Sequence, residues 1–407
     1  MDISTGYSNT YLGVEAGQNN NGFDNVIIGR QAGNDATDTD KLVLIGNSAG
    51  ADINSADADG TVAIGYQAGY SITSGQRQTF LGYQAGYSTT TGDENVFIGY
   101  QAGYGNIDNI GNIYIGKQAA YNIGDGSYNV AIGEEAMKST GTAANNHPNY
   151  NVSIGNQTGY NLTTGDYNVF LGSGAGFSTT TVQGSIAIGY NTMRVHTTGA
   201  KNIAIGHQAM DDTDAGSTSL GSSDNIFMGY NAGGGTWTTA ASSYNVGIGN
   251  YVMDSALDGA LYNTAIGFSA LSAITTGDHN TTLGYKAGQN MTTGLYNVII
   301  GSQAGDAASI GNYHVLLGAF AGTSINSGDA DGTTAIGYQA GQVLTSGIGS
   351  TAIGYQALVS ATENDYNTAV GSRALYSISG SSGLQGEANT AIGYYAGYSN
   401  TTGNSNV

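Results

Sequence analysis

The sequence lacks cysteine altogether and contains only one proline, one tryptophan and nine lysine or arginine residues. Without cysteine the chain has no disulfides and no thiolate metal sites. A single proline and the lack of a Gly-X-Y period exclude collagen, despite 67 glycines. The formal charge of −20 argues against nucleic-acid binding, which needs clustered cations. No apolar run reaches membrane-spanning length, so we expect neither nucleic-acid binding nor membrane insertion.

What the chain does contain is one short unit, repeated throughout. A glycine preceded by Ile, Leu, Met or Val recurs 22 times, and 13 of the 21 intervals between these glycines are 17 residues. We number positions in each unit from this glycine, so that Gly99 is position 0 and Ile98 is position −1. Position −3 is β-branched in all 22 units, position −4 is Asn in 15, and position +3 is Ala in 19. A repeat this regular is typical of a solenoid.

Each part of the unit predicts a part of one coil. The β-branched and aliphatic residues favour a short strand, and we expect Val96 and Ile98 to face the interior as a core ladder. Gly99 permits a sharp bend, and Ala102 suits a narrow interior. Because one coil cannot bury a core alone, coils must stack. The sequence therefore predicts an all-β fold: a single-chain parallel β-solenoid of about 22 coils, one continuous array over residues 1–407. Since no capping segment is visible at either end, we expect a segment of a longer fibre.

Stacking would align identical residues from coil to coil. We expect the asparagines at position −4, such as Asn95, Asn112 and Asn129, to form an amide ladder. We also expect two columns of stacked tyrosines, one with Tyr66, Tyr83 and Tyr100, and the other with Tyr70, Tyr87, Tyr104 and Tyr121.

The middle strand residue suggests oligomerisation. If positions −3 and −1 face inward, position −2 must face outward, yet it is apolar in most units. An exposed column of this kind would exceed the apolar patches that monomers tolerate, so we interpret it as a subunit interface. The alternative is that each coil's own turn covers this residue. The interface candidates are Phe80, Phe97, Tyr114, Phe170 and Phe227.

Two further groups of residues are candidate sites. The longest insertions fall at one corner of the coil, and loop insertions of this kind often mark a binding edge. Trp237 and Tyr244 in one such loop are binding candidates, although tolerated loop drift is the favoured explanation of the insertions. Two Asp-x-Asp-Gly turns supply carboxylates that suit Ca²⁺, but they lack a closing Glu and the full ligand set, so a plain acidic turn is the preferred interpretation. The four carboxylates are Asp57, Asp59, Asp329 and Asp331.

No catalytic constellation is visible. The five histidines show no metal-ligand spacing, and no Ser or Thr is paired with a base in a recognisable motif. We therefore expect a protein that is not an enzyme and that has no cofactor, apart from the Ca²⁺ candidates.

The units Asn129–Gly133 and Ser185–Gly189 resemble the head repeat of trimeric autotransporter adhesins, and similar repeats occur in bacteriophage tail fibres. The adhesin repeat is commonly shorter than 17 residues. The resemblance implies a left-handed β-roll, three chains packed together and an extracellular location on a cell or virion surface. It implies a structural fibre or adhesin shaft that binds a host-surface receptor or glycan through edge loops or its tip.

Two other functions stay open. Ice binding is suggested by the recurring Thr-Thr-Gly, as at Thr90–Gly92 and Thr163–Gly165, although adjacent threonines on a strand face opposite ways. Glycan binding is suggested by the many tyrosines.

Overall fold

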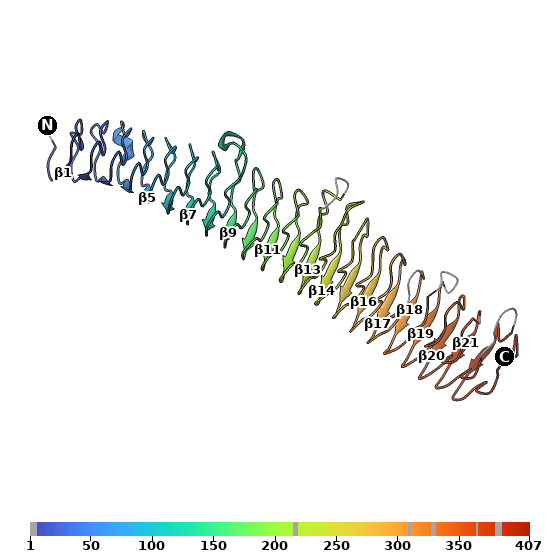
Figure 1. Ribbon diagram of the computed structural model, residues 1–407. Coiled ribbons are helices and arrows are strands. Elements are labelled where there is room, and N and C mark those ends of the chain that lie inside the picture. The colour runs from blue at the N-terminus through green and yellow to red at the C-terminus, as the bar shows by residue number, and fades with distance from the viewer. Residues whose placement is uncertain (1–5, 215–218, 308–310, 327–330, 364, 379–384) are drawn as a thin grey trace. The chain divides into compact units, whose positions relative to one another are not determined.

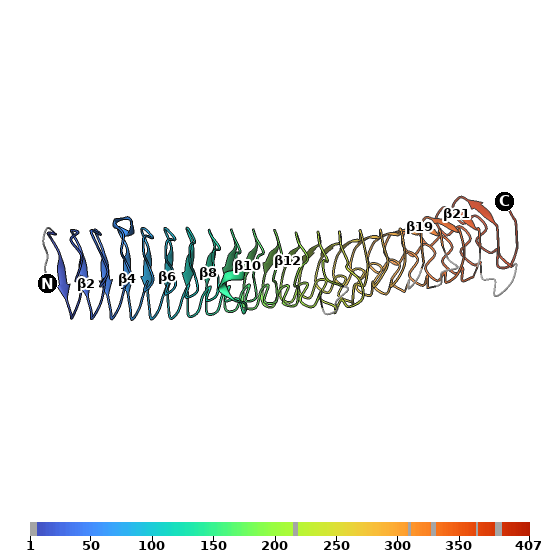
Figure 2. The ribbon, with the colours of Figure 1, turned by 90° about the horizontal axis from the view of Figure 1, so that it is seen from above.

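The computed structural model describes residues 6–214, 219–307, 311–326, 331–363, 365–378 and 385–407. The chain divides into two compact units, Met1–Lys201 (unit 1) and Asn202–Val407 (unit 2). Each unit is a parallel β-solenoid in which every coil contributes one three-residue strand. Figures 1 and 2 show that the strands of each unit follow one another along one side of its coils.

Unit 1 contains eleven strands, each paired in parallel with the strand of the next coil, with positions −3, −2 and −1 in register. They are β1 (Thr10–Leu12), β2 (Val26–Ile28), β3 (Val43–Ile45), β4 (Val62–Ile64), β5 (Thr79–Leu81), β6 (Val96–Ile98), β7 (Ile113–Ile115), β8 (Val130–Ile132), β9 (Val152–Ile154), β10 (Val169–Leu171) and β11 (Ile186–Ile188). Among the described residues, helix is confined to two short 3-10 turns, η1 (Ala56–Ala58) and η2 (Ala143–Asn145).

Unit 2 repeats this architecture with eleven further parallel strands. They are β12 (Ile203–Ile205), β13 (Ile226–Met228), β14 (Val246–Ile248), β15 (Thr264–Ile266), β16 (Thr281–Leu283), β17 (Val298–Ile300), β18 (Val315–Leu317), β19 (Thr334–Ile336), β20 (Thr351–Ile353), β21 (Thr368–Val370) and β22 (Thr390–Ile392). The predicted parallel solenoid with a 17-residue repeat and about 22 coils is thus confirmed. One continuous array over residues 1–407 stays a prediction.

The strand orientation predicted from the sequence is wrong. Phe97, at position −2, is completely buried, whereas Val96 and Ile98 on either side of it are half-exposed. The reason is the alternation of side chains along a strand. Asn95 at position −4 is also buried, because its amide bonds to main-chain groups inside the coil, and this fixes position −2 as the next inward residue. Positions −3 and −1 therefore face outward.

The core is completed on the other side of the coil by positions +3 and +4. Ala102, at position +3, is buried as predicted. The residue at position +4 lies against the side chain at position −2, and a large residue at one of the two positions is always matched by a small residue at the other. Every aromatic residue at −2 is matched by Gly or Ala at +4, and each Met or Leu at +4 is matched by Ala or Gly at −2. The seven larger +4 residues are Met137, Met193, Met210, Met253, Leu271, Leu358 and Leu375.

The repeat glycine allows the coils to stack closely. Gly99 has φ +135°, and a Cβ placed on it would lie 2.5 Å from the carbonyl oxygen of Gly116 in the next coil. Similar close approaches recur between successive repeat glycines within each unit. The sequence prediction of a sharp bend is confirmed, and close backbone approach is a second reason for glycine at this position.

The predicted asparagine ladder is confirmed. The main-chain N–H of Asn112 donates to Oδ1 of Asn95 (3.0 Å), and the N–H of Asn129 donates to Oδ1 of Asn112 (2.8 Å). The Nδ2 group of Asn112 donates to the Gly126 carbonyl at 2.8 Å. Each buried amide is therefore hydrogen-bonded to the coils around it, as a buried polar group requires.

Candidate interaction face

The outward side of the strands forms a face made of two columns, with aliphatic residues at position −1 and Val, Ile or Thr at position −3. Its side chains are half-exposed within the chain, as Ile113 (38%), Ile154 (39%) and Leu283 (45%) illustrate. In unit 1 the column at −1 contains only Ile and Leu, and the column at −3 contains Val, Ile and two Thr. We call these two columns, with the residues that flank them at positions −5 and +1, the strand face.

Tyrosines flank the aliphatic columns in many coils. The predicted column at +1 is confirmed: the ring centroids of Tyr66 and Tyr83 are 5.2 Å apart, and those of Tyr83 and Tyr100 are 5.3 Å apart. At position −5, Tyr296 and Tyr313 stack at 5.7 Å. Because the rings lie nearly parallel, neighbours cover their faces, and these tyrosines are still about half-exposed.

The second predicted tyrosine column, at position +5, is also confirmed. Tyr70, Tyr87, Tyr104 and Tyr121 stack with successive centroid distances of 5.2, 5.1 and 5.0 Å. Burial is the main cause that raises the pKa of Tyr104, and the neighbouring tyrosines raise it further. The Tyr104 phenol is therefore neutral at physiological pH.

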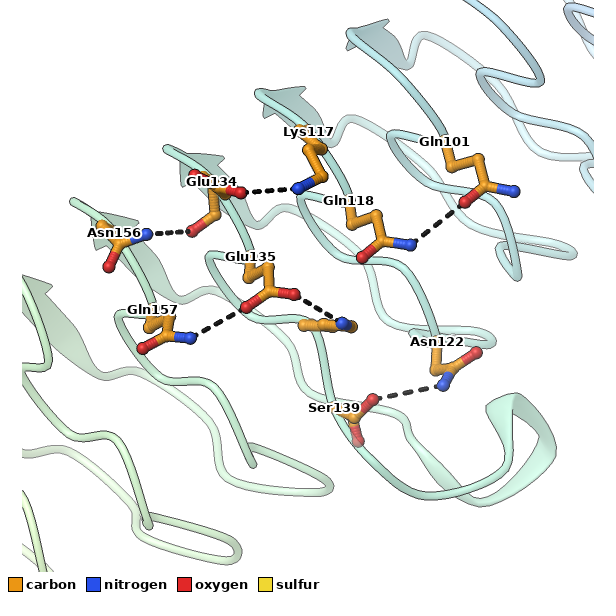
Figure 3. A network of polar contacts seen from close by, with 10 residues as sticks. Gln101, Lys117, Gln118, Asn122, Glu134, Glu135, Ser139, Asn156 and Gln157 are labelled. Atoms are coloured by element: carbon orange, nitrogen blue, oxygen red, sulfur yellow. Dashed lines mark hydrogen bonds and ion pairs between the residues drawn. The ribbon is translucent and has the colours of Figure 1, made fainter.

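Position +2 carries a ladder of polar side chains beside the strand face (Figure 3). Gln118 donates to Gln101 at 3.1 Å, and Gln157 donates to Glu135 at 2.8 Å. Hydrogen bonds from Lys138 and Gln157 lower the pKa of Glu135. At position +1, the exposed pair Lys117–Glu134 (2.8 Å) joins successive coils, and an exposed pair of this kind contributes little stability. These contacts align neighbouring coils and bring together no reactive pair.

The predicted interface column is not on the surface. Phe80, Phe97, Tyr114, Phe170 and Phe227 are all fully buried inside their own coils. Phe80 stacks on Phe97 at 4.9 Å, and Phe97 stacks on Tyr114 at 4.8 Å. The interpretation as a subunit interface is therefore wrong for these residues, because they form the core.

The two loop candidates differ in their surroundings. Trp237 is fully buried, with its ring edge against Phe227 at a centroid distance of 6.1 Å. It fills the core and is not a surface binding residue. Tyr244 is half-exposed and stacks on Tyr262 at 4.9 Å. It belongs to the tyrosine column at position −5, so it lies on the strand face.

The carboxylates considered for Ca²⁺ serve main-chain groups. Oδ1 of Asp59 accepts the N–H of Asp40 (2.8 Å), and Oδ1 of Asp331 accepts the N–H of Asn312 (2.7 Å). Asp57 lies in the 3-10 turn that Ser55 caps, and Asp329 lies outside the described residues. Across the described ranges, no three His, Cys, Asp or Glu side chains gather as a metal site would require.

The Asp59 and Asp331 contacts belong to a ladder that the sequence analysis missed. At position −6, Asp, Asn or Ser side chains repeatedly accept a main-chain N–H of the preceding coil, as Asp93 does from Gln76 (2.8 Å) and Asp166 from Asn149 (2.7 Å). The recurrence of these residues six places before the glycine was the available signal. Some of the many acidic residues therefore stabilise the fold through these hydrogen bonds.

In the described part of the chain, no helix is long and apolar enough to span a membrane. In comparisons with known proteins, the sequence matches no protein-family model and no curated protein.

Proposed function

We propose that the protein is a structural component of an extracellular fibre, the shaft of a cell-surface adhesin or of a bacteriophage tail fibre. The observation that carries the proposal is the construction of each unit from equivalent coils, each bonded to the next by main-chain and side-chain ladders. Such an array grows in one dimension by adding coils. This suits a spacer or shaft, and the proposal assigns the chain no catalytic reaction and no cofactor.

The proposed fibre contains three chains with left-handed coils, as the resemblance to adhesin head repeats implies. The exposed aliphatic columns support association, because contiguous apolar surface of this extent is uncommon on monomers. The column that the sequence suggested for this contact is buried, so the strand face takes its place in the proposal.

Adhesion would use groups that remain exposed on the fibre. The stacked tyrosines offer hydroxyl groups and ring edges to a host-surface receptor or glycan. Their covered faces give little support to sugar stacking on the rings, which needs an open aromatic face.

Ice binding has less support than the fibre. The first threonine of the Thr-Thr-Gly turns uses its hydroxyl within the solenoid, as when Thr163 donates to the Thr180 carbonyl (3.1 Å) and Thr275 to the Thr292 carbonyl (3.1 Å). These hydroxyl groups therefore do not form a free array for ordered water.

The proposal is tested by locating the protein where it is made. Antibodies raised against the purified chain should label fibres on producing cells or on virus particles released from them, viewed by immunogold electron microscopy. The mass of the extracted fibre segment should correspond to three chains. Label confined to the cell interior would contradict the proposal.

A further inference from the structure

The strand face of unit 2, from β14 to β22, differs from the rest of this acidic molecule because it carries no carboxylate, lysine or arginine; Asp224, at position −5 of the β13 coil, lies just before it. From Tyr244 to Tyr394, positions −5, −3, −1 and +1 hold only uncharged aliphatic, aromatic and small polar residues, together with His279. Yet residues 202–407 contain 13 acidic and two basic residues, a net charge of −11. Charged residues begin outside these columns, at positions −6 and +2, as with Asp278 and Lys286.

The residues of this face are exposed and regularly placed. In strands β14 to β22, positions −3 and −1 point outward; position −1 is aliphatic throughout, whereas position −3 is Thr in six strands and Val in three. Ile248, Ile266 and Val298 are each more than a third exposed. Tyr262 and Tyr296 on one flank, and Tyr285 on the other, are about half-exposed. Stacked rings and ladders hold these side chains in place, so little conformational freedom remains to be lost on docking.

Unit 1 does not offer an equivalent surface. Its aliphatic columns are flanked by charged residues at positions −5 and +1, which include Arg30, Lys41, Arg77, Glu94, Lys117 and Glu134. Arg77 pairs with Glu94 (2.9 Å) and Lys117 with Glu134 (2.8 Å), yet docking on this face would remove these charges from water, which is costly even for paired groups. Extensive docking without that cost is possible on unit 2 alone.

We propose that the strand face of unit 2 is the surface through which copies of this chain associate, face to face, in the fibre. Two copies of this strongly negative chain repel one another where their charged surfaces meet. An approach through uncharged surfaces avoids most of this repulsion. The uncharged face is such a surface, and burying its aliphatic residues supplies the driving force. This inference rests on the proposed fibre and names the contact that holds its chains together.

The area of the face is sufficient for a stable contact. Nine strands spaced ~4.8 Å apart give a length of about 43 Å, and the four columns span roughly 20 Å. Each copy would thus bury on the order of 850 Å². A stable protein–protein interface buries about 800 Å² per partner, so no additional surface is required.

Two matched double variants test the inference. Thr264→Glu/Thr281→Glu places two carboxylates on adjacent rungs of the strand face, at position −3. Thr276→Glu/Thr293→Glu places two carboxylates in the same two coils, on exposed residues away from the face. Both variants change the charge equally and leave the buried core untouched. Circular dichroism melting should show that both are folded.

The readout is the mass of the full chain in solution, measured by light scattering and sedimentation over a range of concentrations. We expect the wild type and Thr276→Glu/Thr293→Glu to be oligomeric, with a mass that corresponds to three chains. For Thr264→Glu/Thr281→Glu, the chain concentration at which half of the oligomer is dissociated should be at least 30-fold higher than for the wild type.

Two outcomes would overturn the inference. If both variants associate like the wild type, another surface joins the copies, and the proposed fibre is unaffected. If the wild type is monomeric at every concentration, the self-association inference and the three-chain fibre both fail. Immunogold labelling would then still decide the extracellular location separately.

Discussion

At the scale of single residues, His314 is the exception in the asparagine ladder. It occupies position −4, and its main-chain N–H still donates to Oδ1 of Asn297 at 2.8 Å. The side chain is buried, and neither ring nitrogen has a hydrogen-bond partner among the described residues. Burial lowers the pKa of His314 to about 4, although the nearby carboxylate of Asp331 favours the charged ring. The ring is therefore neutral when the protein is folded at pH 7.

This histidine should make the stability of the protein depend on pH. The pKa in the unfolded chain is 6.5, so between pH 6.5 and about 4 the unfolded state binds more protons than the folded state. The free energy of unfolding should then fall as the pH drops through this window, by about 3 kcal/mol in all. His314→Asn should remove most of this dependence in denaturant titrations between pH 7 and 4. The control His279→Asn, at an exposed histidine, should retain it, and an unchanged slope in His314→Asn would contradict the assignment.

Residue identities alone predicted the ladders but not the direction of the side chains. The recurrence of Asn95 and its equivalents predicted the amide ladder, and the tyrosine columns followed from the same alignment. The orientation failed because hydrophobicity marks Val96, Phe97 and Ile98 equally. The decisive information was the buried asparagine two residues before Phe97, since an amide that bonds to the main chain must point inward.

At the scale of the coil, the inverse sizes of positions −2 and +4 show that each coil is packed as a unit. In one coil Phe170 is paired with Gly176, and in the next coil Ala187 is paired with Met193. A Cβ on Gly176 would lie 3.1 Å from the Phe170 ring, whereas Met193, with a similar positive φ of +51°, lies beside the small side chain of Ala187. This compensation is visible in the sequence and would have placed position −2 in the core.

Replacing Phe170 and Gly176 by the Ala and Met found at the same positions in the next coil should therefore reproduce the core packing of that coil. Phe170→Ala should cost about 3–4 kcal/mol because it leaves a cavity, and Gly176→Met alone should destabilise by crowding the ring. The destabilisation of the double variant should be smaller, by ~1–2 kcal/mol, than the sum of the two single destabilisations. A double-mutant cycle based on denaturant unfolding measures this difference. Phe97→Ala combined with Gly176→Met, in distant coils, is the control and should be additive. Additivity in the Phe170 pair would disprove the packing relationship.

At the scale of the whole molecule, the fold was predictable because the period alone dictates stacking. The surface that faces partners was not predictable, since it depends on side-chain direction and on where charges are absent. Each coil interacts only with its neighbours, as in other one-dimensional repeat arrays. The 17-residue unit should thus be removable wherever the two new neighbours match.

Deleting residues 96–112 tests this equivalence. The deletion joins Asn95 to Ile113, which restores the sequence Asn-Ile-Tyr-Ile-Gly of an intact strand. Phe80 then lies beside Tyr114, so the aromatic stack of the core continues, and Asn129 can donate to Asn95 in place of Asn112. We expect cooperative melting by far-UV circular dichroism, with the midpoint within about 5 °C of the wild type.

A deletion of nine residues, 104–112, is the matched control. It leaves Gly103 joined to Ile113, so that the coil lacks its return turn and the −4 asparagine that bonds to the next coil. The following coils could then pair with the preceding ones only by shifting the register, which moves core residues to the outside. This variant should lose cooperative melting or aggregate. If the 17-residue deletion is equally damaging, the coils are not interchangeable, and their stability depends on contacts that reach beyond adjacent rungs.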